Sequence, residues 1–284
     1  MPSWAPEPPL PLPSGCVVHV PGRGEMFLRD TGGDGPPVLL LHGWMFSADL
    51  NWYRTYAALA EAGYCVLAVD HRGHGRGLRS PEPFSLRACA DDAAGLLAHL
   101  QIPPVLAVGY SMGGPIASLL ARHHAQWVSG VVLGATAMDW SGRRMRTFWR
   151  TMAALRLAMG LAPESFWLRG LKASGFPESQ LTTWTAAELS RGNSVDIAEA
   201  GRELGRYDSR AWIAGLDALG AVIVTTEDTA VPPSKQRALA AAMSAPVFEV
   251  RGDHTAVITR ANEFNNQLLK ALDAVRDPRA ATTA

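Results

Sequence analysis

Cysteines and long apolar runs are both scarce in this sequence, and each shortage excludes a class of protein. The 284 residues include three cysteines, Cys16, Cys65 and Cys89, and no C-x-x-C pair. An odd number of cysteines at unrelated spacings predicts neither a disulfide framework nor a zinc site. No apolar stretch approaches the roughly 20 residues that span a bilayer, and residues 1–16 lack the basic start and apolar run of a signal peptide. We therefore expect a cytoplasmic protein with no transmembrane segment.

The sequence also lacks an excess of charge of either sign. Lys and Arg together number 26, Asp and Glu together number 26, and the formal net charge is +0. No global field therefore favours nucleic acid, an anionic membrane or another polyanion as a partner. A neutral small molecule fits this balance best, and the sequence leaves the oligomeric state open. The 48% hydrophobic residues provide for a substantial core.

Short apolar runs alternate with amphipathic ones along most of the chain. Strands are expected over residues 17–20, 25–29, 37–41, 64–69, 105–109, 128–133, 221–225 and 246–250. Helices are expected over 51–62, 86–100, from just after Ser111 to about 123, 234–243 and 258–275. This alternation predicts an α/β fold with a mostly parallel central sheet flanked by helices on both faces.

The alternation stops between residues 138 and 214, where helical patterns continue without a good strand. We therefore expect a helical cap inserted into a core that consists of residues 17–137 and 215–277. Residues 1–16 are rich in proline and predict an extended or disordered arm. Residues 278–284 are small and polar and predict a flexible tail.

The sharpest local motif is Gly109-Tyr110-Ser111-Met112-Gly113, which matches the G-x-S-x-G pattern. An apolar strand pattern precedes it and a helical pattern follows it, so the serine falls on a tight strand-to-helix turn. Such a turn exposes the serine oxygen above the sheet and directs the helix N-terminus toward it. The alternative is a glycine-lined turn with an idle serine. The strand-turn-helix context favours a nucleophile.

A serine nucleophile needs a base, and the order of residues along the chain narrows the choice among the eight histidines. Where this turn carries the nucleophile, the order along the chain is serine, acid, histidine. His123 and His124 lie about three turns along the helix that starts at Ser111, too far to reach it. His254 directly follows a predicted strand and can lie at the carboxyl edge of the sheet, where open α/β sheets place their sites. We therefore predict His254 as the base.

The acid should also follow a strand, and Asp228 comes just after the strand predicted over 221–225. Its role would be to orient the imidazole and stabilise the protonated ring. Glu227 and Asp139 are rivals for this role. Asp253, adjacent to His254, suits a turn-capping role better.

An oxyanion needs two backbone donors. We predict the N–H of Met112, next to the nucleophile, and the N–H of Trp44 in the His42-Gly43-Trp44 loop. His42 is expected to hold this loop through ring hydrogen bonds. The glycine-rich stretch 70–77 has Leu78 where a dinucleotide motif would have its third glycine, and it has no zinc-ligand spacing. It predicts a rigid loop beside the site.

Together these motifs resemble the α/β-hydrolase superfamily over about residues 17–275. The resemblance implies a serine esterase with a Ser-His-Asp acyl-enzyme mechanism, a small-molecule ester substrate, and no metal or cofactor. Similar members include esterases, lipases, cofactor-free haloperoxidases and C–C bond hydrolases, so perhydrolysis, lactone opening and C–C cleavage remain alternatives, as does a non-catalytic binder. Epoxide hydrolases and haloalkane dehalogenases carry Asp at the position of Ser111, which argues against both.

The predicted cap is rich in Met and aromatic residues, which beside a pocket favour a hydrophobic acyl or aromatic substrate. Plain packing of the cap on the sheet is the alternative explanation for many of them. The predicted substrate-binding residues are Tyr110, Trp140, Phe148, Trp149 and Met152.

Overall fold

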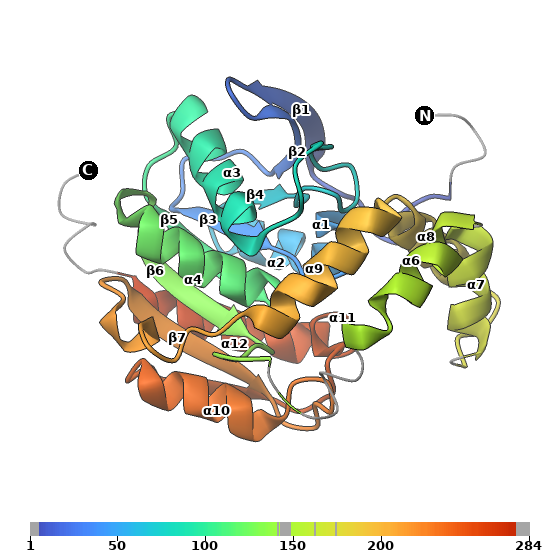
Figure 1. Cartoon of the computed structure of the whole chain (residues 1–284). Helices are drawn as coiled ribbons and strands as arrows, with labels where there is room; N and C mark the ends of the chain where they lie inside the picture. The colour runs from blue at the N-terminus through green and yellow to red at the C-terminus, as the bar shows by residue number, and fades with distance from the viewer. Residues whose placement is uncertain (1–5, 141, 143–148, 162, 174, 277–284) are drawn as a thin grey trace.

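The structure, a computed structural model, describes residues 6–140, 142, 149–161, 163–173 and 175–276. These residues form an eight-stranded sheet in the order β1-β2-β4-β3-β5-β6-β7-β8 (Figure 1). The strands are β1 (Ser14–Val20), β2 (Gly24–Asp30), β3 (Pro37–Leu41), β4 (Cys65–Val69), β5 (Val105–Tyr110), β6 (Val128–Gly134), β7 (Leu219–Thr225) and β8 (Val247–Val250). β2 pairs antiparallel with β1 and with β4, and the remaining neighbours are parallel. The mostly parallel sheet confirms the predicted fold class.

Helices cover both faces of this sheet. One face carries α3 (Leu86–His99), α4 (Gly113–His123) and α10 (Pro233–Ala242). The other carries α1 (Ala48–Trp52), α2 (Tyr56–Glu61), α11 (Ala256–Thr259) and α12 (Ala261–Val275). Two short 3-10 helices, η1 (Ala125–Trp127) and η2 (Ile213–Gly215), precede β6 and β7.

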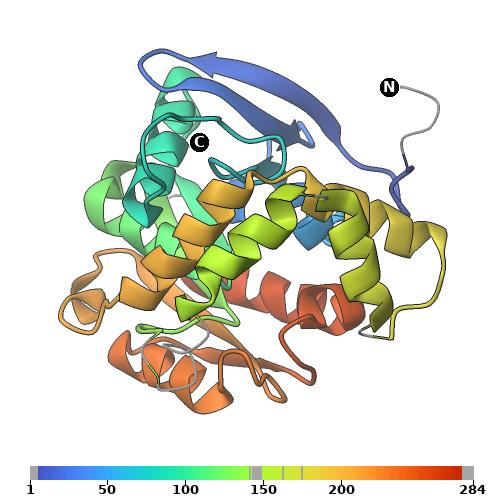
Figure 2. The ribbon, with the colours of Figure 1, turned by 45° about the vertical axis from the view of Figure 1, so that its right-hand side comes forward.

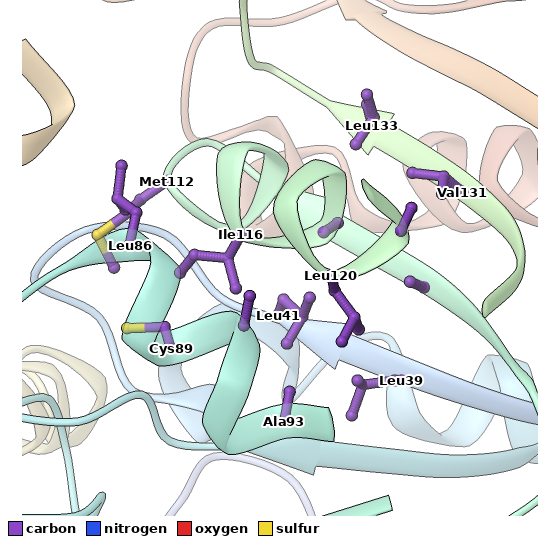
Figure 3. Close-up of a cluster of buried hydrophobic side chains, with 14 of the residues drawn as sticks. Leu39, Leu41, Leu86, Cys89, Ala93, Met112, Ile116, Leu120, Val131 and Leu133 are labelled. Atoms are coloured by element: carbon purple, nitrogen blue, oxygen red, sulfur yellow. The ribbon is translucent and has the colours of Figure 1, made fainter. Parts of the chain in front are cut away.

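Strand β3 shows why its sequence is apolar throughout. Its side chains alternate between the two faces, so Leu39 and Leu41 belong to one core cluster and Val38 and Leu40 to the other. All four are fully buried. In Figure 3, Leu39 and Leu41 lie beneath Leu120 and its neighbours on α4.

The helix predicted over 51–62 was wrong in its bounds, because the chain forms two short helices there instead. α1 begins at Ala48, since Ser47 caps it by accepting a hydrogen bond from the Leu50 N–H. The chain then turns, with the Thr55 N–H donating to the Trp52 carbonyl at 2.7 Å. The final predicted helix is likewise divided at Arg260, whose φ of −122° interrupts the helical backbone.

The first strand begins earlier than predicted, within the proline-rich stretch. Ser14 pairs with Asp30 at the start of the β1–β2 hairpin. The Arg29 guanidinium also donates to the Pro13 carbonyl at 2.8 Å. The edge of the sheet therefore fixes part of the segment that composition alone assigns to a free arm.

Residues 138–214, called here the helical segment, contain α6 (Met152–Leu161), α7 (Pro163–Ala173), α8 (Gln180–Ser190) and α9 (Ser194–Arg206). α6 packs against α9 and α7 against α8, while α8 contacts α1 and α9 contacts α3 of the core. Figure 2 shows α6 and α9 side by side. No helix within the described residues is long and apolar enough to cross a membrane.

Candidate active site

Ser111 lies in a strained turn between β5 and α4. Its φ of 53° is in the left-handed region, which non-glycine residues rarely adopt. The Ser111 N–H donates to the Gly134 carbonyl at 2.9 Å, which ties the turn to β6. A Cβ atom at Gly109 would lie 2.2 Å from the Gly113 carbonyl oxygen, and one at Gly113 would lie 2.0 Å from the Leu41 carbonyl oxygen. Both flanking glycines are therefore required by close backbone approach.

The side chains of Ser111, His254 and Asp228 form one hydrogen-bonded chain. His254 Nε2 lies 2.9 Å from Ser111 Oγ, and His254 Nδ1 lies 2.7 Å from Asp228 Oδ2. The three residues follow the carboxyl ends of β5, β8 and β7, which lie at one edge of the sheet. This edge is where open α/β sheets hold their ligands.

Asp228 is buried, with 3% of its surface exposed, and its carboxylate accepts several hydrogen bonds. Oδ1 accepts from the N–H groups of Ala230 and Val231 at 2.8 and 2.9 Å. Oδ2 accepts from the Thr225 hydroxyl at 2.9 Å in addition to facing His254. These donors compensate for the removal of the carboxylate from water and fix its orientation toward the imidazole.

The rival acids are engaged elsewhere. Asp139 pairs with Lys235 at 2.9 Å, and Glu227 pairs with Arg251 at 3.0 Å on the surface. Asp253 accepts hydrogen bonds from the backbone and hydroxyl of Thr255, as a turn cap does. Of the candidate acids, Asp228 is the one that the structure brings to His254.

The rival histidines also lie away from the nucleophile. His124 pairs with Asp91 through Nε2 at 2.6 Å, near the end of α4. His123 is exposed on the last turn of the same helix.

The His42-Gly43-Trp44 loop packs directly on the nucleophile. A Cβ atom at Gly43 would lie 3.4 Å from Ser111 Cβ. His42 Nε2 accepts a hydrogen bond from the His71 N–H at 3.0 Å, which leaves Nδ1–H to donate to the Gly43 carbonyl at 2.8 Å. In a trans peptide the carbonyl and the next N–H point in opposite directions. The ring of His42 therefore orients the N–H of Trp44 away from itself.

Three imidazoles are buried together at this loop, those of His42 itself, His71 and His74. The ring centroids of His42 and His71 are 4.1 Å apart, and those of His42 and His74 are 5.6 Å apart. Burial lowers the pKa of His71 to about 3 and that of His74 to about 4, and burial with two ring neighbours holds the pKa of His42 well below its usual range. The rings are therefore neutral at pH 7. Within the described residues, no group of three or more His, Cys, Asp or Glu side chains is arranged to hold a metal ion.

Tyr110 does not lie where the substrate-binding prediction places it. Tyr110 is 3% exposed, and its ring packs against Trp52 and Phe264 in one core cluster, with its centroid 5.9 Å from that of the His254 ring. Its hydroxyl donates to the His254 carbonyl at 3.0 Å. Tyr110 therefore supports the loop that carries the imidazole instead of lining a substrate pocket.

Three of the other predicted substrate-binding residues, Trp140, Trp149 and Met152, are buried in one core cluster. Trp149 makes an edge contact with Trp44, with ring centroids 5.3 Å apart. Met152 and Trp140 are buried in the same core cluster as Met112. Phe148 lies outside the described residues.

Helix α9 supplies two contacts that the sequence reasoning missed. The Trp44 indole N–H donates to the Ile197 carbonyl at 2.7 Å. A Cβ atom at Gly201 would lie 2.7 Å from Met152 Sδ and 3.0 Å from the Trp44 ring. The sequence signal was the pair Gly201 and Gly205, four residues apart on one helix face, which allows bulky side chains to approach the backbone.

Comparison with known proteins agrees with this architecture. The sequence model of the alpha/beta hydrolase family matches residues 38–267. A non-heme haloperoxidase of Rhodococcus erythropolis is 40% identical over 110 residues, which are 38% of this chain and 39% of that protein. A bifunctional esterase/perhydrolase of Acinetobacter calcoaceticus is 32% identical over 111 residues, which are 38% of this chain and 40% of that protein. The chain thus spans about two fifths of the length of these curated relatives.

Among solved structures, a hydrolase from Pseudomonas aeruginosa has the same fold. It superposes with a TM-score of 0.79 and 23% identity, over 92% of this chain and 99% of that one. Since the family match covers most of the sequence, the chain belongs to the alpha/beta hydrolase family.

Proposed function

We propose that the protein hydrolyses carboxylic esters, with Ser111 as nucleophile, His254 as base and Asp228 as the acid that orients it. The observation that carries this proposal is the continuous hydrogen-bonded chain from Ser111 Oγ through the imidazole to Asp228. Family membership supports a hydrolase. The positive φ of Ser111 is typical of a nucleophile held on a strained turn.

In the proposed mechanism, His254 Nε2 takes the proton of Ser111 Oγ as the oxygen attacks the ester carbonyl. The N–H groups of Trp44 and Met112 stabilise the resulting oxyanion. The imidazolium, stabilised by Asp228, then gives its proton to the leaving alkoxide, and the acyl group stays on Ser111. Water deprotonated by His254 attacks the acyl-enzyme, which releases the acid and restores the serine. No step needs a metal or an organic cofactor.

The proposed substrate is a small, neutral ester with an apolar acyl or aromatic group. The edge contact of Trp149 with the Trp44 ring supports this, as does the approach of Met152 and Trp44 to the same position on α9, Gly201. Trp140 belongs to the same buried cluster. Apolar side chains around Trp44, next to the loop that packs on Ser111, favour substrates that are largely apolar.

Perhydrolysis is the second candidate, and the names of the two curated relatives favour it. The same residues would serve, with hydrogen peroxide in place of water. Attack of peroxide on the acyl-enzyme breaks the ester bond to Ser111, releases a peracid and returns a proton to the serine through His254.

The test is hydrolysis of p-nitrophenyl acetate, butyrate, octanoate and palmitate by the wild type, by Ser111→Ala and by Ser118→Ala. Ser118 is a matched control, because it is also buried and its hydroxyl donates to the Gly114 carbonyl within α4 at 2.9 Å. We expect Ser111→Ala to lose activity on every ester and Ser118→Ala to retain it. Wild-type activity that survives in Ser111→Ala would refute the proposal. Added peroxide that diverts the product from acid to peracid would favour the second candidate.

A further inference from the structure

An ionic network with buried carboxylates joins the helical segment to the core close to the His42-Gly43-Trp44 loop. Its centre is Glu188 on α8, which is 2% exposed. Glu188 Oε2 accepts a hydrogen bond from the Ser47 hydroxyl at 2.8 Å, and Oε1 accepts from Arg76 at 2.7 Å. The network consists of three carboxylates and three guanidinium groups, those of Asp49, Asp70, Glu188, Arg29, Arg76 and Arg191. Buried charges need such partners, so each member constrains the others.

Arg76 links Glu188 of the helical segment to two carboxylates of the core. Its guanidinium lies 3.1 Å from Asp49 on α1 and 3.7 Å from Asp70 after β4, besides its bond to Glu188. Asp49 and Asp70 are 0% and 1% exposed. Glu188 therefore shares the Arg76 guanidinium with Asp49 and Asp70. Removal of the Glu188 charge would change the charge balance around both of these carboxylates.

Ser47 links Glu188 to α1, which in turn contacts the His42-Gly43-Trp44 loop. It is the N-cap of α1, and its oxygen accepts from the Leu50 N–H at 3.1 Å while its hydroxyl donates to Glu188. Asn51, on the same short helix, accepts a hydrogen bond from the Gly43 N–H at 3.0 Å. α1 has five residues, too few to be stable without its contacts. Its position, and through Asn51 that of Gly43, therefore depends on the groups that hold its first turn.

We propose that Glu188 is a positioning residue that couples the docking of α8 to the geometry of the His42-Gly43-Trp44 loop, here called the oxyanion loop, through Ser47, α1 and Asn51. The inference rests on the proposed function, because it concerns the Trp44 N–H as an oxyanion donor. Oxyanion stabilisation depends on donor distance, and complete loss of one donor costs about 10²- to 10³-fold in kcat. A small displacement of the loop should lower kcat by a smaller factor.

The first test compares Glu188→Gln with Glu199→Gln on the best ester. Glu199, on α9, also ties the helical segment to the core, since it accepts a hydrogen bond from the Phe84 N–H at 2.9 Å. It is the matched control for docking that does not involve α1. We expect Glu188→Gln to lower kcat about 10-fold with KM changed less than about 2-fold, and Glu199→Gln to leave kcat unchanged.

The second readout is inhibition by a trifluoromethyl ketone that carries the acyl group of the best ester. Its adduct with a serine places an oxyanion in the proposed hole, so its inhibition constant should rise in Glu188→Gln by about the factor lost in kcat. An unchanged kcat and inhibition constant in Glu188→Gln would overturn the inference. Equal losses of kcat in Glu188→Gln and Glu199→Gln would also overturn it. They would indicate that any weakening of the contact between the helical segment and the core lowers kcat, without a particular route through α1.

Ser47→Ala keeps the test informative if the Glu188 variant does not fold. It removes the bond to Glu188 and the cap of α1 while leaving the pair of Glu188 with Arg76, and it should lower kcat at least as much as Glu188→Gln does. If both single variants fold, the double variant should lose little more than Ser47→Ala alone, because the residues act in one chain. Additive losses would contradict the inference. Activity that survives in Ser111→Ala would instead remove the proposed function itself, so the two failures are distinguishable.

Discussion

Lowering the pH from 7 to 5 should destabilise the fold, because His71 and His74 are buried in neutral form at the oxyanion loop. Their pKa values in the folded protein are about 3 and about 4, whereas the ordinary value is 6.5. Between pH 6.5 and 4, His71 and His74 are therefore protonated in the unfolded chain but neutral in the native protein. A histidine whose pKa is lowered by folding leaves the full stability in place above pH 6.5, and stability is lost as the pH falls below that value.

The expected loss can be worked out from these pKa values. Between pH 7 and pH 5 each of His71 and His74 contributes about 2 kcal/mol of destabilisation. Asp70 acts in the opposite direction, because burial raises its pKa to about 6 and the native protein takes up a proton there. This offsets about 1 kcal/mol. The net loss is about 3 kcal/mol before His42, which acts in the same direction as the other histidines. Total stabilities are typically about 5–15 kcal/mol, so the effect is large.

Urea unfolding at pH 7, 6 and 5, followed by circular dichroism, measures this loss. His74→Gln keeps an amide that can donate to the Arg72 carbonyl, which His74 Nδ1 contacts at 3.0 Å, but it cannot titrate. Its stability should fall about 2 kcal/mol less than that of the wild type between pH 7 and pH 5. His99→Gln removes an exposed histidine and should follow the wild type. A wild type equally stable at both values, or a His74→Gln curve as steep as the wild type, would refute the reasoning.

Two further predictions concern the site and its turn. Asp228→Asn should lower kcat about 10³- to 10⁴-fold, since the imidazole loses its orientation and its counter-charge, whereas Asp139→Asn should stay close to wild type in the same ester assay. The reverse outcome would reassign the acid. Gly113→Ala should cost more than about 3 kcal/mol or prevent folding, because its Cβ would lie 2.0 Å from the Leu41 carbonyl oxygen. Gly215→Ala meets nothing within 4 Å and should stay within about 0.5 kcal/mol of the wild type in urea unfolding.

The strands and the nucleophile turn were predictable because their signals are local. A strand buried on both faces requires a continuous apolar run, as in β3, and the turn at Ser111 requires glycine where backbones touch. The start of α1 at Ala48 was not predictable from apolar spacing, because it depends on the Ser47 cap and on Asp70, which accepts from the Ala48 N–H at 2.6 Å. Asp70 is distant in sequence, so no local pattern records the contact.

The prediction misplaced Tyr110 and missed Glu188, for two different physical reasons. Tyr110 stands beside the nucleophile in sequence, yet side chains alternate across a strand, so its ring points into the core cluster that contains Trp52 and Phe264. Glu188 looks like an ordinary surface acid within α8, and its burial follows from the packing of α8 against α1. Sequence patterns identify which residues can do chemistry more readily than which residues hold them in place.

The most direct test of the proposed mechanism is the reaction of the protein with a fluorophosphonate, followed by intact mass and peptide mapping. An activated serine loses its proton to the base and displaces fluoride from phosphorus. We expect one adduct per chain on Ser111, with labelling greatly slowed in His254→Ala and absent in Ser111→Ala. An unlabelled Ser111 in wild-type protein that still hydrolyses esters, or an adduct on a different serine, would contradict the account.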